Sequence, residues 1–314
     1  MKRLFFIITA LCLLSGTATL KAAEPLQYGN FESWTTRNFK ESHLIGGKSR
    51  KVYEVGPQAS YTDDKGYRPE ASQWATSNVV AKVAGITKCS NAVFPDTRAD
   101  GGRCAKLTTL IEHCSALGII DIDVLVASTM FLGRMFEPIK STSQPYSKME
   151  MGVPFTRRPE AVEFDYRVEV PQGAGRIYSS GFGKKKTMKG TDRAEVMVLL
   201  QRRWEDADGN LYAKRVGTGR ERFGTTTAGW VNKHHMPITY GNATGKDLPD
   251  LIAPDRSYYA RNSKGKMVPV REVGWDEPDA TPTHIILMFS AGSGAPYVGT
   301  PGLTLWVDNV GMVY

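Results

Sequence analysis

Cysteine and histidine are scarce in this sequence of 314 residues, and their scarcity excludes several classes of protein. Four cysteines cannot form the disulfide framework of a small secreted domain, so a hydrophobic core must stabilise the fold. Cys89, Cys104 and Cys114 lie after residue 23 and allow one disulfide with one free thiol, without indicating the pair. The five histidines lack metal-ligand spacing such as His-Glu-x-x-His. His234 and His235 are adjacent, so on a strand they would point to opposite faces.

Long apolar runs and helical periodicity are also absent from the sequence. The apolar run at residues 4–14 is too short to span a membrane. No segment repeats apolar residues at helical spacing between capping residues, so helices should be few and short. The sequence has neither a Gly-x-Ser-x-Gly nucleophile elbow nor a P-loop, and we assign no catalytic residue.

The first 23 residues have the organisation of a secretory signal peptide. Lys2 and Arg3 precede the apolar run, and small residues follow it. Leu11 precedes Cys12 where a lipoprotein signal has a small residue, so we expect no lipid anchor. We therefore predict an exported protein, in the periplasm or at the cell surface, with a single folded domain over residues 24–314.

The charge of the chain is nearly balanced. The formal net charge is +8, and removal of residues 1–23 removes three basic and no acidic residues, which leaves +5. The lysine run at residues 184–186, with Lys189, lies between glycines and lacks interleaved aromatic residues. We interpret this run as a solvated loop and predict no nucleic-acid partner.

Alternation of apolar and polar residues dominates the rest of the chain. Residues 162–170 and 120–126 alternate as half-buried antiparallel strands do. Residues 196–200 and 284–289 are apolar on both faces, which indicates central strands covered on both sides. Many short strands with glycine- and proline-rich turns predict an all-β fold, an antiparallel β-sandwich or jelly roll with few short helices. We expect the intervals 46–78 and 229–282 to be long loops over this sandwich.

Two acidic segments have a local structural interpretation. Residues 206–210 (Asp-Ala-Asp-Gly-Asn) resemble the start of a calcium-binding loop, but the twelfth position is Gly217, so we predict a hairpin turn. In the last ten residues the apolar alternation shifts by one position at Asp308 and Asn309, which predicts a β-bulge. A buried carboxylate at Asp308 requires a partner.

Several motifs resemble one known family. They are residues 29–34 (Gly-Asn-Phe-Glu-Ser-Trp), Gly101-Gly102 before an apolar strand, and residues 152–159 (Gly-Val-Pro-Phe-Thr-Arg-Arg-Pro). With the closing segment they resemble, in order, the putative carbohydrate metabolism domain (PCMD), over nearly the whole mature chain. The resemblance implies a galactose-binding-like jelly roll similar to carbohydrate-binding modules, in proteins that saccharolytic bacteria export.

The resemblance also implies a use for the acid in the last strand. In jelly rolls of this kind the first and last strands lie side by side, so Glu32 and Asp308 could share a calcium ion with carbonyl groups of residues 100–102. The alternative is that Glu32 is a surface carboxylate and Asp308 caps the bulge through backbone N–H groups. We expect a structural calcium ion and keep the alternative open.

Aromatic side chains are the candidates for a sugar site, because sugar rings stack their C–H faces on flat aromatic rings. Trp74 and Trp275 lie in polar segments, and Tyr258 and Tyr259 adjoin arginines. Arginines in the family-like element could hold a glycan hydroxyl or carboxylate, although the bracketing prolines favour a structural role. The predicted carbohydrate site comprises Trp74, Trp275, Tyr258, Tyr259, Arg157 and Arg158.

Three functions are compatible with the sequence. The leading hypothesis is a non-catalytic protein of polysaccharide utilisation that binds a polysaccharide or oligosaccharide. A glycoside hydrolase or lyase would require two carboxylates that flank a cleft, a spacing that a sequence cannot show. The third is a structural subunit of a surface glycan-uptake or adhesion assembly, with outer-membrane proteins as partners.

Overall fold

The computed structural model describes residues 22–314 except 63–71, 84, 117–119, 141–144, 174, 182 and 255–257. The predicted signal peptide at residues 1–23 lies outside the described residues apart from its last two positions. Short 3-10 helices occur at His43–Ile45 (η1) and Pro145–Lys148 (η2). In the described part of the chain, no helix has the length and hydropathy needed to cross a membrane.

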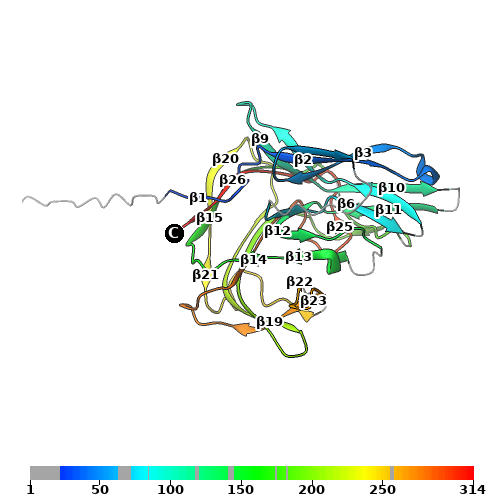
Figure 1. The fold of residues 1–314 in the computed structure, drawn as a ribbon. Coiled ribbons are helices and arrows are strands. Elements are labelled where there is room, and N and C mark those ends of the chain that lie inside the picture. Colours follow the sequence, from blue (N-terminus) through cyan, green and yellow to red (C-terminus); the bar gives the residue numbers. More distant parts are fainter. Residues whose placement is uncertain are drawn as a thin grey trace, which may run out of the picture.

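Two large sheets form a β-sandwich, so the predicted all-β fold is confirmed (Figure 1). The first has six strands in the order β20-β15-β26-β9-β8, and β1 also pairs with β26. Its strands are β1 (Glu24–Pro25), β8 (Val93–Thr97), β9 (Arg103–Thr108), β15 (Ala161–Glu169), β20 (Val231–Pro237) and β26 (Thr304–Val313).

The second sheet has ten strands and closes on itself. Its order is β14-β24-β18-β19-β23-β22-β13-β12-β5, with β21 paired to β19. A further pairing of β24 with β12 joins β24, β18, β19, β23, β22, β13 and β12 into a ring. The strands are β5 (Trp74–Thr76), β12 (Thr129–Met135), β13 (Met149–Met151), β14 (Val153–Pro154), β18 (Ala194–Glu205), β19 (Leu211–Phe223), β21 (Thr239–Tyr240), β22 (Tyr259–Arg261), β23 (Met267–Trp275) and β24 (His284–Ser290).

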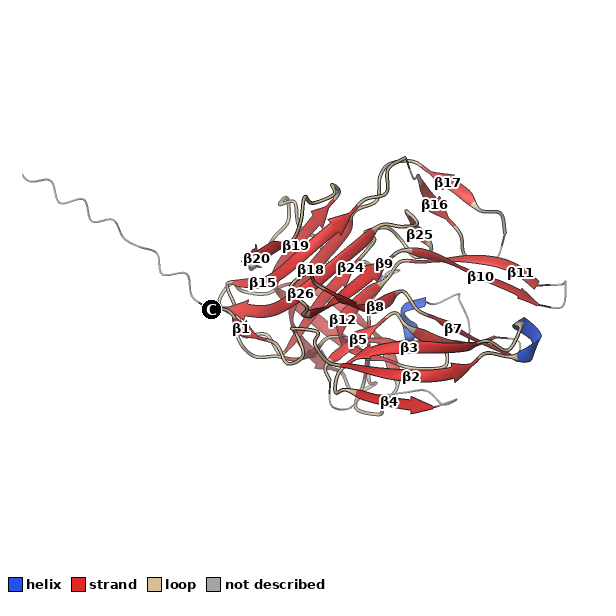
Figure 2. Ribbon diagram, turned by 90° about the horizontal axis from the view of Figure 1, so that it is seen from above, coloured by secondary structure: helices blue, strands red, loops and turns tan. Residues whose placement is uncertain are grey.

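Smaller sheets extend from one end of the sandwich, where Figure 2 shows the β2–β3 and β10–β11 hairpins. The intervals 46–78 and 229–282, which we expected to be long loops, contain strands of these sheets and of the sandwich. The smaller sheets comprise β2 (Trp34–Lys40), β3 (Ser49–Val55), β4 (Ala59–Thr62), β6 (Val79–Val83), β7 (Ile86–Ser90), β10 (Leu110–Ala116), β11 (Ile120–Val126), β16 (Arg176–Tyr178), β17 (Lys186–Met188) and β25 (Val298–Gly299).

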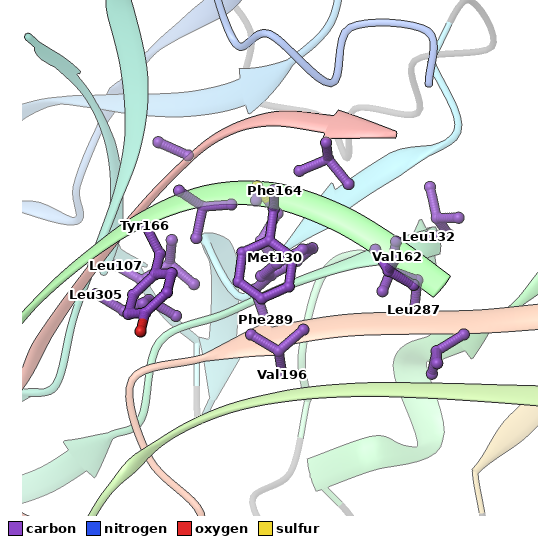
Figure 3. Packing of buried hydrophobic residues seen from close by; sticks show 14 of the residues in the cluster. Leu107, Met130, Leu132, Val162, Phe164, Tyr166, Val196, Leu287, Phe289 and Leu305 are labelled. Carbon is purple, nitrogen blue, oxygen red and sulfur yellow. The ribbon is translucent and has the colours of Figure 1, made fainter. Parts of the chain in front are cut away.

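The central strands β18 and β24 are buried on both faces, as the sequence predicted. On the face toward the first sheet, Phe289 packs edge-on against Phe164 of β15, with ring centroids 5.5 Å apart (Figure 3). On the other face, inside the ring of strands, Leu199 and Ile286 belong to a second apolar cluster with Phe131. Burial of large apolar side chains on both faces makes these strands the centre of the fold.

The predicted bulge in β26 is present. Asp165 of β15 pairs with Asp308 and Glu163 pairs with Gly311, so β26 has one extra residue between these pairs. Asn309 takes up the extra residue with a φ of 50°, in the left-handed region that asparagine tolerates better than most residues. The bulge keeps the apolar side chains on both sides of it in the core.

The segment that begins at β1 lies beside the last strand. The Leu26 N–H donates to the Val310 carbonyl and the Val310 N–H donates to the Gly29 carbonyl, both over 2.9 Å. A Cβ atom on Gly29 would lie 2.5 Å from the Val310 oxygen. Glycine at this position therefore allows the close approach of the segment after β1 to β26.

We expect Gly29→Ala to lower the free energy of unfolding by about 1–3 kcal/mol, because the added carbon forces the two segments apart. Urea unfolding followed by tryptophan fluorescence measures this loss. Gly229→Ala is the matched control, since nothing lies within 4 Å of a Cβ atom at Gly229. Equal midpoints for the two variants would contradict the proposed contact.

A buried ion cluster joins β2 and β3 to Glu137, two residues after the end of β12. The Arg37 guanidinium donates to Glu137 over 2.7 Å and to Glu54 over 2.9 Å. The Val80 N–H also donates to Glu137, over 2.7 Å. Burial, with a contribution from the neighbouring Glu137, raises the pKa of Glu54 to about 8 against the opposing effect of Arg37. Two carboxylates therefore share one guanidinium inside the fold.

This cluster predicts a pH dependence of stability. In the folded state Glu54 binds a proton more tightly than in the unfolded chain, where the ordinary pKa is 4.5. Its contribution to stability is complete below pH 4.5 and declines as the pH rises through about 8. We expect Glu54→Gln to reduce this decline, which urea unfolding at pH 5, 7 and 9 measures. An unchanged slope between pH 5 and 9 would show that Glu54 titrates normally.

Candidate functional site

Strands β18 and β19 form a long hairpin whose end projects away from β2 and β3 (Figure 1). The carboxylate of Asp206 accepts the N–H groups of Asp208 and Asn210 over 3.0 and 2.8 Å. Gly209 completes the turn with a φ of 89°, which glycine adopts without strain. The hairpin interpretation of residues 206–210 is thus confirmed.

The strand register assembles one surface from three strands. Trp204 of β18 lies opposite Tyr212 of β19, and Tyr212 lies opposite Arg271 of β23. Residues two positions apart on a strand share a face, so Arg202, Lys214 and Gly274, which are paired across the same three strands, lie on the same side. We call this surface the platform; it comprises Trp204, Tyr212, Arg271, Arg202, Lys214 and Gly274.

The platform presents an aromatic side chain to solvent. Trp204 is 43% exposed, although large aromatic side chains are usually buried. Its ring lies beside that of Tyr212, with centroids 5.8 Å apart and planes inclined by 21°. Nothing lies within 4 Å of a Cβ atom at Gly274, so the surface next to Lys214 is open. Because the two rings stack on each other, the exposed part of the Trp204 indole and the open surface at Gly274 are where a sugar ring could pack.

Hydrogen bonds hold the edges of the platform in place. Arg202 donates through Nε and Nη2 to Asp276, over 2.6 and 2.9 Å. Side-chain and backbone hydrogen bonds from Asn210 lower the pKa of Asp206, and the Tyr212 side chain also bonds this carboxylate. Within the described residues, neither Lys214 nor Arg271 forms an ion pair. The charge of Lys214 helps to lower the pKa of Asp276, and the Arg271 guanidinium lies 5.9 Å from the centroid of the Tyr212 ring.

The reverse side of these strands is a buried polar network inside the ring. Arg215 and Glu272 form an ion pair in which both side chains are fully buried, with Nε 2.6 Å from Oε1. The Ile252 N–H and the Gln201 amide also donate to Glu272. Burial lowers the pKa of Arg203 to about 10, and its guanidinium donates to Gln201 and to a backbone carbonyl. This network supports the platform from beneath.

Removal of the charge of Glu272 should destabilise the fold strongly. We expect Glu272→Gln to cost about 3–5 kcal/mol, because it leaves Arg215 as an uncompensated buried cation. Glu24→Gln is the control: Glu24 also pairs with an arginine, but both side chains are at least half exposed. Such a pair contributes about 0–1 kcal/mol, so the control should unfold like the wild type. Equal losses in denaturant unfolding would contradict the structural role of Glu272.

Trp74 does not lie in a sugar site, and its assignment from the sequence is corrected. It is 1% exposed in β5, within the main core beside Phe31 and Phe289. Its indole N–H donates to the carbonyl of Gln27 over 2.9 Å. The polar neighbours of Trp74 in the sequence suggested a loop, but the sheet buries this ring, which presents no face to a ligand.

The other predicted aromatic residues are not brought together. Tyr258 packs against Tyr146 in the second apolar cluster, and burial raises its pKa. Tyr259 is half-buried in β22, opposite Pro269. Trp275 is half-buried opposite Arg215 in the strand register, with its ring 5.5 Å from that guanidinium. Their separate partners do not form one binding surface.

Arg157 contacts β1 and the last residue, and Arg158 contacts the loop before β24. Arg157 donates to Glu24 over 2.6 Å, and its guanidinium lies 3.7 Å from the Tyr314 ring centroid. Arg158 donates to the carbonyl groups of Pro278, over 2.6 Å, and Ala280. These contacts favour the structural role that the bracketing prolines indicated.

The carboxylates of Glu32 and Asp308 do not share a ligand. Arg98 donates to Asp308 and Asp165 over 2.8 and 2.9 Å, so a guanidinium contacts Asp308 where we expected calcium. Asp308 also accepts the Asn309 N–H over 2.9 Å, and thus caps its own bulge. Glu32 accepts the N–H of residue 103 instead. In the described ranges, no group of three or more acidic, histidine or cysteine side chains could hold a metal ion.

The cysteines after residue 23 are free thiols, and the two adjacent histidines have different partners. Cys89 and Cys104 are buried free thiols, and burial raises the pKa of each to about 12. Cys114 is also free, so the disulfide that the sequence allows is not formed. His234 contacts Glu221 whereas His235 contacts Glu163, as expected for adjacent residues of a strand.

Sequence reasoning missed the pair of rings at the centre of the platform. The signal was present: Trp204 and Tyr212 each lie four residues from Asp208, the middle of the predicted hairpin. Residues placed symmetrically about a tight turn face each other across the two strands.

Comparison with known proteins relates the chain to carbohydrate chemistry. The sequence model of one family, described as putative carbohydrate metabolism domain, matches residues 38–250. A solved structure titled a putative glycoside hydrolase from Bacteroides thetaiotaomicron is 15% identical, with a TM-score of 0.45 and coverage of 86% of this chain and 76% of that one. A carbohydrate-binding module, CBM28, specific for non-crystalline cellulose, is 10% identical, with a TM-score of 0.27 and coverage of 77% and 88%. Comparison with curated proteins gives no match.

Proposed function

Because the chain belongs to the putative carbohydrate metabolism domain family, we propose that it is an exported carbohydrate-binding protein that holds a polysaccharide on the platform. The family match includes both rings of the platform, Trp204 and Tyr212. Export follows from the signal-like segment at residues 1–23 and would place the protein in the periplasm or at the cell surface, where polysaccharides and outer-membrane uptake proteins occur.

The exposed ring of Trp204 is the observation that carries this proposal. An indole on a strand face that is 43% exposed leaves apolar surface in water, and a sugar ring would cover it with its C–H face. Arg271 and Lys214 provide donors beside the rings for sugar hydroxyl groups. A surface that extends over three strands suits an extended chain of sugars.

Binding without hydrolysis fits the carboxylates around the platform. A glycosidase needs a carboxylic acid that stays protonated and a second carboxylate across the scissile bond. Although desolvation opposes the shift, Arg202 lowers the pKa of Asp276, so this carboxylate stays ionised. Asp206 has a lowered pKa as well. Neither group can serve as the general acid at neutral pH.

Substitution of the exposed indole tests the proposal. We expect Trp204→Ala to weaken binding to a polysaccharide at least tenfold, which corresponds to about 1.4 kcal/mol. Affinity electrophoresis on gels that contain xylan, mannan, laminarin, pectin or amorphous cellulose identifies the ligand, and titration calorimetry measures the affinity. Retention of full affinity in Trp204→Ala would exclude the platform as the site.

Tyr61→Ala is the matched control. Tyr61 lies in β4 and is 47% exposed, so this variant removes a similarly exposed ring away from the platform. We expect its affinity to equal that of the wild type. Equal losses in the two variants would indicate a general effect on folding, which thermal unfolding of both proteins would detect.

A further inference from the structure

A separate cavity lies at the end of β15 in the first sheet. It has a volume of about 410 Å³, within the range of small-molecule sites. Residues 167–172 form one wall and residues 226–229 form the other. Thr226 and Thr227 accept the N–H groups of Val170 and Val168, so hydrogen bonds fix the second wall to the strand.

Arg167 is held in an orientation that leaves its donors available. Its guanidinium lies 4.0 Å from the ring centroid of Trp306, the residue of β26 that is paired with it. Stacking on the indole fixes the plane of the guanidinium and leaves the N–H groups at its edge free to donate. A donor that is oriented before binding loses less conformational entropy when a ligand arrives.

Glu169 provides an acceptor on the same face of the strand. The Arg167 Nη2 and Glu169 Oε2 atoms are 3.8 Å apart, beyond the range of a direct hydrogen bond. A hydroxyl group between them can accept from the guanidinium and donate to the carboxylate at the same time. The apolar surfaces of Val170 and Pro171, which line the same cavity, can contact C–H groups. This combination of groups matches a polyhydroxylated ring.

We propose that this cavity is a second binding site, which takes a single sugar unit such as a monosaccharide or the end of a glycan chain. The site is separate from the platform because its strand residues, Arg167–Glu169, lie in β15 of the first sheet, whereas the platform lies on β18, β19 and β23 of the second. The platform extends over three strands and suits the middle of a chain, whereas the cavity, with a volume of about 410 Å³, suits one sugar unit. The protein would therefore hold a chain and a chain end at separate places.

Saturation-transfer NMR with single sugars tests this proposal. The probes are D-glucose, D-galactose, D-mannose, D-xylose, L-arabinose and D-galacturonate, each added to the full-length protein without its signal peptide. We expect at least one probe to receive saturation from the wild type, and Trp204→Ala to retain the same signal. Absence of a signal for every probe, or its loss in Trp204→Ala, would overturn the second site without affecting the proposal for the platform.

Filling the cavity provides the decisive variant. Gly229 lies in its wall with nothing within 4 Å of a Cβ atom, so Gly229→Trp places an indole in this space. We expect this variant to lose the sugar signal while it keeps the polysaccharide affinity of the platform. Glu169→Gln, on an exposed side chain that does not threaten folding, should weaken sugar binding at least tenfold. An unchanged signal in both variants would refute the proposed site.

Gly274→Trp is the reciprocal control, because it covers the open row of the platform instead. It should abolish polysaccharide binding and leave the single-sugar signal intact. Loss of both activities in either glycine variant, with unchanged thermal stability, would show that one shared site binds both ligands and would overturn the proposal.

Discussion

Strands β18 and β24 are buried on both faces, and this burial determines how the other elements are arranged around them. One face of these strands packs on the first sheet, and the other is enclosed by the ring that the β24–β12 pairing closes. Val198 and Leu199, adjacent in sequence, thus belong to different apolar clusters. A strand in this position can carry polar side chains only where it extends beyond one of the two layers that pack on it, or where its polar groups pair with one another.

The position of the platform follows from this constraint. The side chain of Leu200 still belongs to the main core, whereas Arg202 and Trp204, on the same side of β18, are exposed because the hairpin extends beyond the first sheet. The opposite side of the hairpin remains inside the ring, where Arg215 and Glu272 neutralise each other. The surface that we assign to sugar binding is therefore the part of a core strand that lacks its outer cover.

Arginine satisfies most buried carboxylates of this protein. Arg98 joins Asp165 of β15 to Asp308 of β26, and Arg37 joins β2 to Glu54 and Glu137. Its fork of donors contacts two carboxylates at once, which a lysine ammonium does less specifically. In each case one guanidinium links segments that are distant in the sequence, so the pairing also helps to define which strands meet.

Features that depend on local periodicity could be predicted from the order of residues. Alternation over residues 162–170, apolar residues on both faces at 196–200, the turn at 206–210 and the phase shift at Asp308 each report backbone geometry over a few residues, and the strands, hairpin and bulge agree with them. Which side chains are covered and which charges meet depends instead on how distant strands pack together. Trp74 has polar neighbours but lies under a sheet, Trp204 follows a core strand but emerges from it, and Asp308 meets an arginine 210 positions away. Burial and ion pairing depend on where distant strands end, and residue order along the chain does not encode that position directly.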